Sequence, residues 1–62
     1  MLYDYLFDVI SHFDGKDPER CLSMIEKSKE YEYISPEEYK NLYRMIKDKY
    51  YAYQRENKGM GK

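Results

Sequence analysis

The sequence has few of the residues that staple or activate a small protein. Its 62 residues include one cysteine, one histidine and no tryptophan. The single Cys21 excludes an intramolecular disulfide, and its place in an apolar helical pattern suits a small buried side chain better than a reactive thiol. A reducing compartment is the simpler interpretation. No apolar run reaches the roughly 18 residues of a membrane-spanning helix, and the N-terminus carries acids where a signal peptide carries basic residues. We expect a cytoplasmic protein without membrane contact.

The few candidate catalytic and metal-binding residues lack the arrangement that either chemistry needs. Ser11 cannot face His12 from the next position of a helix, and Cys21 is separated from His12 by a turn. The segment 12–17 has neither the spaced carboxylates of a calcium loop nor a second histidine or cysteine for zinc. We therefore expect no enzyme, no metal site and no cofactor.

Hydrophobic residues make up 42% of the chain and charged residues 37%, a balance typical of a small folded domain. A chain of this length buries only about 60% of its extended surface. Such a domain often gains stability from a partner or from a second copy, so a homodimer is an open alternative.

The charges are unevenly distributed along the chain. Residues 1–35 contain four basic and eight acidic residues, whereas residues 36–62 contain seven basic and four acidic ones. The two parts therefore carry formal charges of −4 and +3, which predicts surfaces of opposite electrostatic character.

The hydrophobic periodicity predicts an all-α domain of three helices, at about 2–13, 18–30 and 36–57. The domain is expected to cover residues 1–58, with a flexible tail at 59–62. The first helix is indicated by the helical spacing of four apolar residues, which are Leu2, Leu6, Val9 and Phe13.

Turn and capping signals separate these helices. Gly15 can take the left-handed conformation that follows a helix, and Asp17 before Pro18 is a favourable helix start. The sequence from Ser35 to Glu38 has the pattern of a capping box. Between the second and third helices, residues 30–34 alternate like a short extended connector, whose Tyr31 and Ile34 are expected to fold back on the core.

The first helix has more apolar surface than its main stripe. Tyr3, Phe7 and Ile10 form a second ridge at i, i+4, i+7 spacing, and with Tyr5 the apolar residues cover slightly more than half of the circumference. Packing of this ridge on the third helix, or under the connector from Tyr31 to Ile34, would account for it. Alternatively, the ridge is a protein-binding or dimer face, because apolar patches that cannot be buried internally usually mark contacts.

The third helix carries a basic stripe with a tyrosine in its middle. A phosphate backbone or an acidic protein surface would fit such a stripe, although long helices also keep lysine and arginine on their solvated side. The stripe consists of Lys40, Arg44, Lys47, Tyr51, Arg55 and Lys58. The other tyrosines of this helix are expected at the edge of the core, namely Tyr39, Tyr43, Tyr50 and Tyr53. Tyr51 and two tyrosines elsewhere in the chain, Tyr3 and Tyr33, are better candidates for contacts.

We hypothesise a non-enzymatic regulator or inhibitor that binds another protein through Tyr3, Phe7 and Ile10. Its small size, together with nine tyrosines and only one alanine, favours an origin in a phage or another mobile element of a low-GC bacterium. The alternative is a nucleic-acid-binding protein that uses the basic stripe, and a dimer would place two such helices side by side.

Overall fold

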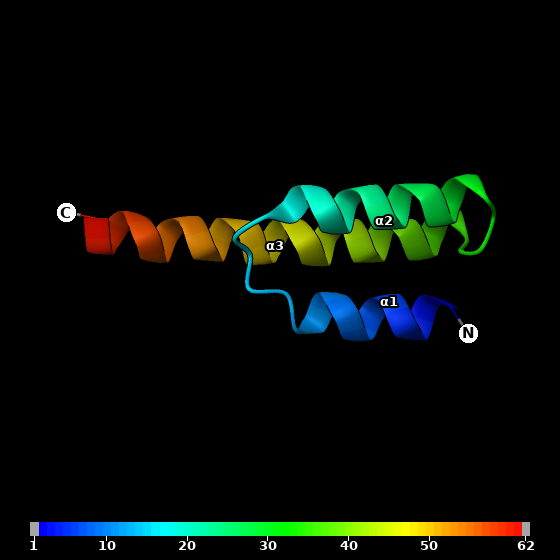
Figure 1. The fold of residues 1–62 in the computed structure, drawn as a ribbon, viewed down its shortest axis with the longest axis horizontal. Helices are drawn as coiled ribbons and strands as arrows, with labels where there is room; N and C mark the ends of the chain where they lie inside the picture. The colour runs from blue at the N-terminus through cyan, green and yellow to red at the C-terminus, as the bar shows by residue number, and fades with distance from the viewer. Residues whose placement is uncertain (1, 62) are drawn as a thin grey trace.

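The computed structural model describes residues 2–61, and the side chains of residues 2–56 (Figure 1). It contains three helices, α1 (Leu2–Ser11), α2 (Pro18–Glu30) and α3 (Pro36–Gly61). No strand occurs within this range. The predicted small all-α domain of three helices is confirmed.

Helix α3 is the element on which the other two pack. Both α1 and α2 lie against it, and the molecule measures 43 × 17 × 17 Å. At 1.5 Å per residue, the 26 residues of α3 span about 39 Å. The C-terminal end of α3 therefore extends beyond α1 and α2, as Figure 1 shows.

A small aliphatic core joins the three helices. Leu42 and Ile46 are fully buried on α3 and meet side chains of both other helices. The remaining members of this cluster are Leu6, Ile10, Cys21, Ile25 and Ile34. Cys21 is thus a buried, free thiol, in agreement with the prediction from its position.

Helix α1 ends two residues earlier than expected. The amide of Phe13 donates a hydrogen bond of 3.0 Å to the carbonyl of Ile10, three residues earlier. This spacing is that of a 3₁₀ turn, so the α-helical geometry ends here. Gly15 follows with φ of 90°, as predicted. A β-carbon on Gly15 would collide with the carbonyl of Lys49 and the β-carbon of Tyr53, so this turn fits against α3 only because the residue is glycine.

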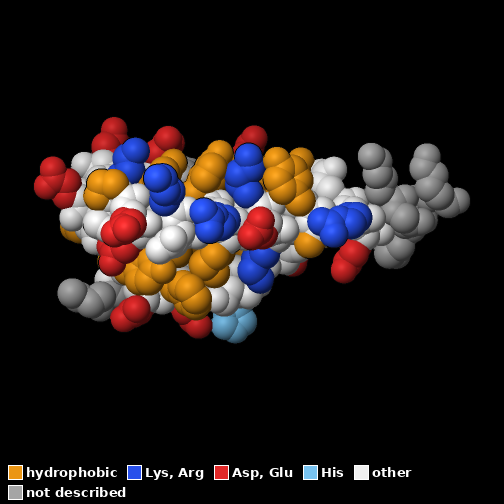
Figure 2. Space-filling model, turned by 180° about the vertical axis from the view of Figure 1, so that it is seen from behind, with side chains coloured by type: hydrophobic (Ala, Val, Ile, Leu, Met, Phe, Trp, Pro, Cys, Tyr) orange, Lys and Arg blue, Asp and Glu red, His pale blue; other side chains and the backbone are white. Residues whose placement is uncertain are grey.

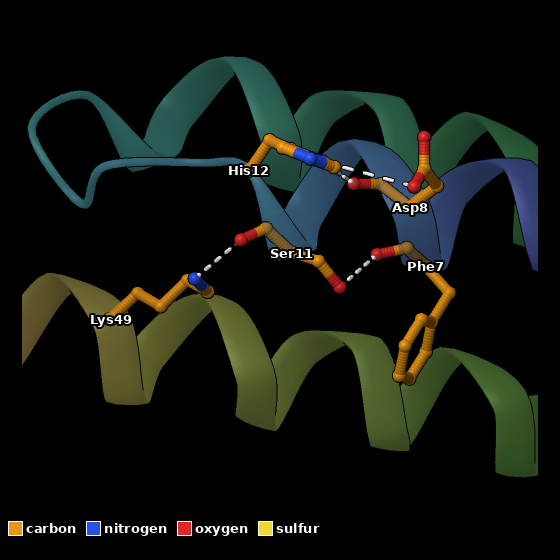
Figure 3. A network of polar contacts seen from close by, with 5 residues as sticks. All are labelled: Phe7, Asp8, Ser11, His12 and Lys49. Carbon is orange, nitrogen blue, oxygen red and sulfur yellow. Dashed lines mark hydrogen bonds and ion pairs between the residues drawn. The ribbon is translucent and has the colours of Figure 1, made fainter.

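A second contact holds the end of α1 on α3. The ammonium group of Lys49 donates a hydrogen bond of 2.8 Å to the carbonyl of Ser11 (Figure 3). Carbonyls in the last turn of a helix lack intrahelical partners, and a cation placed there also interacts favourably with the helix dipole. Lys49 therefore has a structural role: it joins α3 to the end of α1 through a hydrogen bond between residues that are 38 positions apart in the chain.

The connector between α2 and α3 is a tight turn and not the expected extended segment. Tyr33 N–H donates to Ser28 O at 2.8 Å and Glu32 N–H to Lys29 O at 3.0 Å, which is the Schellman pattern at a helix C-terminus. Glu32 holds the left-handed position of this motif, with φ of 64°. Ile34 is buried as expected, but Tyr31 is 65% exposed, so its predicted packing on the core is wrong.

The starts of α2 and α3 differ in their capping. Asp17 occupies the N-cap position of α2, but its side chain makes no capping hydrogen bond, and Pro18 begins the helix. At α3 the capping box is complete: Glu38 N–H donates to Ser35 Oγ at 3.1 Å, and Ser35 N–H donates to Glu38 Oε1 at 2.9 Å.

The expected end of α3, in contrast to that of α1, was too early. Helix α3 continues to Gly61, four residues past the predicted end at 57. Glycine weakens a helix by about 1 kcal/mol but keeps its backbone N–H, so it does not stop a helix as proline does. The flexible tail expected at 59–62 stays a prediction. The side chains of residues 59–61, and Lys62 as a whole, lie outside the described residues.

The left-handed Glu32 generates a stability prediction. Replacement by glycine, Glu32→Gly, removes the steric cost of a β-carbon at this position and should raise the free energy of unfolding by about 0.5–1 kcal/mol. The matched control Glu30→Gly puts the same substitution in the last turn of α2, where it should lower that free energy by up to about 1 kcal/mol. Urea titrations followed by circular dichroism measure both; equal effects would contradict the assigned turn.

Candidate functional site

The predicted protein-binding ridge of α1 is not a single surface. Ile10 is 0% exposed and belongs to the core, so a partner cannot reach it in the folded protein. Tyr3 is partly buried against the same core. Phe7 remains 44% exposed, with its ring centroid 6.0 Å from that of Tyr3. Most of the ridge therefore packs inward, and only Phe7 presents substantial apolar surface.

Phe7 lies on the flank of α1 that faces α3. Figure 3 shows its side chain pointing from α1 toward α3, beside the Lys49–Ser11 contact. Tyr5 is more exposed, but two helical positions turn it roughly 160° away from Phe7. These two aromatic residues therefore do not form one patch.

The basic stripe lies on the outer face of α3, opposite the core. Lys40, Arg44 and Arg55 are exposed, Tyr51 is 51% exposed, and Lys47 is half-buried. The side chain of Lys58, the sixth predicted member, lies outside the described part of the chain. Figure 2 shows basic and hydrophobic side chains alternating along one face of the molecule, with acidic ones among them.

The four described cations of this stripe, Lys40, Arg44, Lys47 and Arg55, are not neutralised by neighbouring acids. Among the side chains of residues 2–56, the only contact that meets the distance of an ion pair joins His12 Nδ1 and Asp8 Oδ1, at 3.8 Å. Glu37 and Asp48 lie at one edge of the stripe by helical projection, yet neither forms an ion pair with it. The stripe is therefore free to interact with an external anion.

An aromatic–cation row runs beside this stripe and partly shares it. Lys47 Nζ lies 5.5 Å from the ring centroids of both Tyr43 and Tyr51. Tyr43 stacks on Tyr39 with centroids 5.9 Å apart, and Lys29 Nζ of α2 lies 4.5 Å from the Tyr39 ring. The row thus consists of Lys29, Tyr39, Tyr43, Lys47 and Tyr51, in that spatial order.

Two further contacts prolong the row toward the C-terminus of α3. The ring centroids of Tyr51 and Tyr50 are 5.7 Å apart, and Gln54 Nε2 donates to the Tyr50 hydroxyl at 2.9 Å. Both contacts hold the rings of this turn in place.

Sequence reasoning missed the contribution of Tyr43 to this surface. It was expected at the edge of the core, but 38% of its surface is exposed. The spacing of Tyr39, Tyr43, Lys47 and Tyr51 at successive fourth positions was a signal for the row, because such residues are neighbours on a helix surface.

Two groups of the row, Lys47 and Tyr39, have raised pKa values. Hydrogen bonding to Tyr51, followed by the influence of Tyr43, raises the pKa of Lys47. Burial, Glu26 and Tyr43 together raise the pKa of Tyr39, so its phenol stays neutral. Because its pKa is raised, Lys47 remains a cation across the physiological range.

A separate groove of about 540 Å³ lies between α1, the first turn and α2. Its apolar lining includes Val9, Phe13 and Met24, and Lys16 and Asp17 stand at its charged rim. Cys21 also contributes to it.

The described residues contain no group of three or more histidine, cysteine, aspartate or glutamate side chains placed to hold a metal ion.

No helix within residues 2–61 is both long and apolar enough to cross a membrane.

The environment of Cys21 predicts low thiol reactivity. Burial first, and then the charge of Asp17, raise the pKa of this thiol above its ordinary value. Because the thiolate is the reactive species, iodoacetamide should alkylate the native protein much more slowly than the urea-unfolded protein near neutral pH. Mass spectrometry of timed samples measures both rates. Equal rates would contradict the buried position.

Comparison with known proteins adds no relative: no protein-family model, curated protein or solved structure matches the chain. The Phe7 flank of α1 and the outer face of α3 are therefore the two candidate binding surfaces of the protein.

Proposed function

We propose that the protein binds nucleic acid through the outer face of α3. The observation that carries this proposal is the row of exposed cations without ion-pair partners on one side of a long helix. Cations that neutralise phosphates release bound counterions, which is the main source of sequence-independent affinity for nucleic acids. The alternative function considered from the sequence thus becomes the better supported one.

The dimensions and the polarity of the molecule agree with this proposal. The stripe from Lys40 to Arg55 extends over about 22 Å at the rise of an α-helix, long enough to follow several phosphates. On α1, Asp4 and Asp8 are exposed and would repel a nucleic acid. This distribution of charge orients a polyanion on α3, even though the formal net charge is −1.

A triple variant tests this proposal, namely Lys40→Gln, Arg44→Gln and Arg55→Gln. Its affinity for labelled DNA and RNA oligonucleotides should fall steeply at low salt, because each lost phosphate contact removes counterion release. The slope of log K against log salt should decrease by about two to three. Fluorescence anisotropy over a range of salt concentrations measures both quantities.

The matched control loses three cations elsewhere, in Lys16→Gln, Arg20→Gln and Lys27→Gln. These residues are exposed in the first turn and on α2, so the control has the same net charge but an intact stripe. It should bind like the unaltered protein. Equal losses in both triple variants, or no binding of any oligonucleotide by the unaltered protein at low salt, would refute the proposal.

Protein binding through α1 remains a second candidate because Phe7 is an exposed apolar ring on the flank of α1 that faces α3. Under this second candidate function, the protein is a regulator or inhibitor of another protein. Phe7 then inserts into a pocket of that partner, as buried aromatic anchors do in many interfaces. Ile10 has no part in the contact, since it belongs to the core.

The substitution Phe7→Asp tests this second candidate. It should abolish association with a partner or with a second copy, and should leave the helical circular dichroism nearly unchanged because the ring is partly solvated. Ile10→Asp is the contrasting variant, which should unfold the domain by placing a charge in the core. Loss of helical signal in Phe7→Asp as well would assign Phe7 to the core and remove this candidate.

The remaining features of the proposed role come from the sequence alone. They are a location in the cytoplasm, the absence of enzymatic activity, a homodimeric form, and an origin in a phage or another mobile element. Light scattering at high concentration addresses the homodimer, and the genomic neighbourhood addresses the origin.

A further inference from the structure

We infer that the nucleic acid bound by α3 is single-stranded, with bases stacked on Tyr43 and Tyr51 and a phosphate held by Lys47. This inference rests on the proposed function and deepens it. Its basis is the aromatic–cation row, in which one lysine lies between two exposed tyrosine rings at 5.5 Å from each.

The order of groups along the row matches the order of groups in a single strand. Tyr43 and Tyr51 are eight residues apart, so their backbone positions are about 12 Å apart along the helix axis with Lys47 midway. Because both ring centroids lie 5.5 Å from Lys47 Nζ, the rings themselves are at most about 11 Å apart. A backbone phosphate that contacts Lys47 leaves its flanking bases near the two rings. Base stacking on aromatic side chains accepts any base, because every base has a π-face.

The two rings have free surface for such stacking. Tyr51 is 51% exposed and Tyr43 is 38% exposed, whereas Tyr39 is partly buried. Tyr43 stacks on Tyr39 and has the Lys47 ammonium over its ring, so a base reaches Tyr43 where the ammonium now lies. The Lys47 ammonium is mobile on its long side chain and can turn from the rings toward a phosphate. The strand then takes the place that the ammonium now occupies over the rings.

The one-sided distribution of charge disfavours a duplex. A helix in the major groove lies between two phosphate backbones, and needs cations on both of its flanks. On α3 the cations follow a single line, while Glu37 and Asp48 are exposed along one edge of it. A duplex would bring one backbone against these carboxylates, whereas one strand can follow the cations alone. A duplex also keeps its bases stacked inside, out of reach of the tyrosine rings.

The test compares a labelled oligo-dT strand with a labelled duplex of the same length, by fluorescence anisotropy over a range of salt concentrations. The unaltered protein should bind the single strand more tightly. The double variant Tyr43→Leu, Tyr51→Leu should lose about 5- to 150-fold in affinity for each base that stacks. Its salt slope should not change, because all cations remain.

Two controls accompany this variant. Tyr43→Phe with Tyr51→Phe keeps both rings and should bind like the unaltered protein. Tyr5→Leu with Tyr31→Leu removes two exposed rings from other parts of the surface, and should also have no effect. Circular dichroism confirms that each variant keeps its helices.

The outcomes separate this inference from the proposed function. Equal or tighter binding of the duplex, or unchanged affinity of the double leucine variant, overturns the single-strand inference. If the triple glutamine variant still loses affinity in that case, the proposed function stands. If the unaltered protein binds neither oligonucleotide, both fail.

Discussion

Burial of one side of α3 is the constraint on which the rest of this structure depends. Helices of 10 and 13 residues, such as α1 and α2, are marginal in isolation and need tertiary packing. Leu42 and Ile46 supply the shared apolar surface, and complete burial of each such side chain contributes about 1.5–3 kcal/mol. Because both short helices use the same side of α3, no other helix covers its opposite side over residues 36–56.

This arrangement sorts the cations of α3 into two roles. Lys49 lies on the flank near α1 and donates to the Ser11 carbonyl, where it completes the end of a helix. Lys40, Arg44 and Arg55 point away from both neighbours and have no ion-pair partner. Lys47 stands between these groups, in contact with Tyr43 and Tyr51. Similar residues on one helix therefore differ in function according to the direction in which they point.

Local signals predicted the local features well. The Ser35–Glu38 capping box and the positive φ of Gly15 both occur, because each depends on a few adjacent residues. The tight turn at Glu32 was missed, since a glutamate seldom adopts the left-handed conformation and gave no glycine signal. Ile10 was assigned to a binding ridge although it is buried, because periodicity shows that two ridges exist but not which neighbour covers each.

The sequence by itself determined the fold class, the approximate helices, the buried thiol and the set of residues that make up the basic stripe. These features follow from periodicity and from contacts between near neighbours in the chain. Only the tertiary structure decided that most of the second ridge of α1 packs inward while Phe7 stays exposed. It also decided that Lys49 is engaged at Ser11 and that Tyr43 joins Lys47 on the surface. The physical reason is that burial depends on where α1 and α2 settle on α3, which is a long-range choice among several apolar faces.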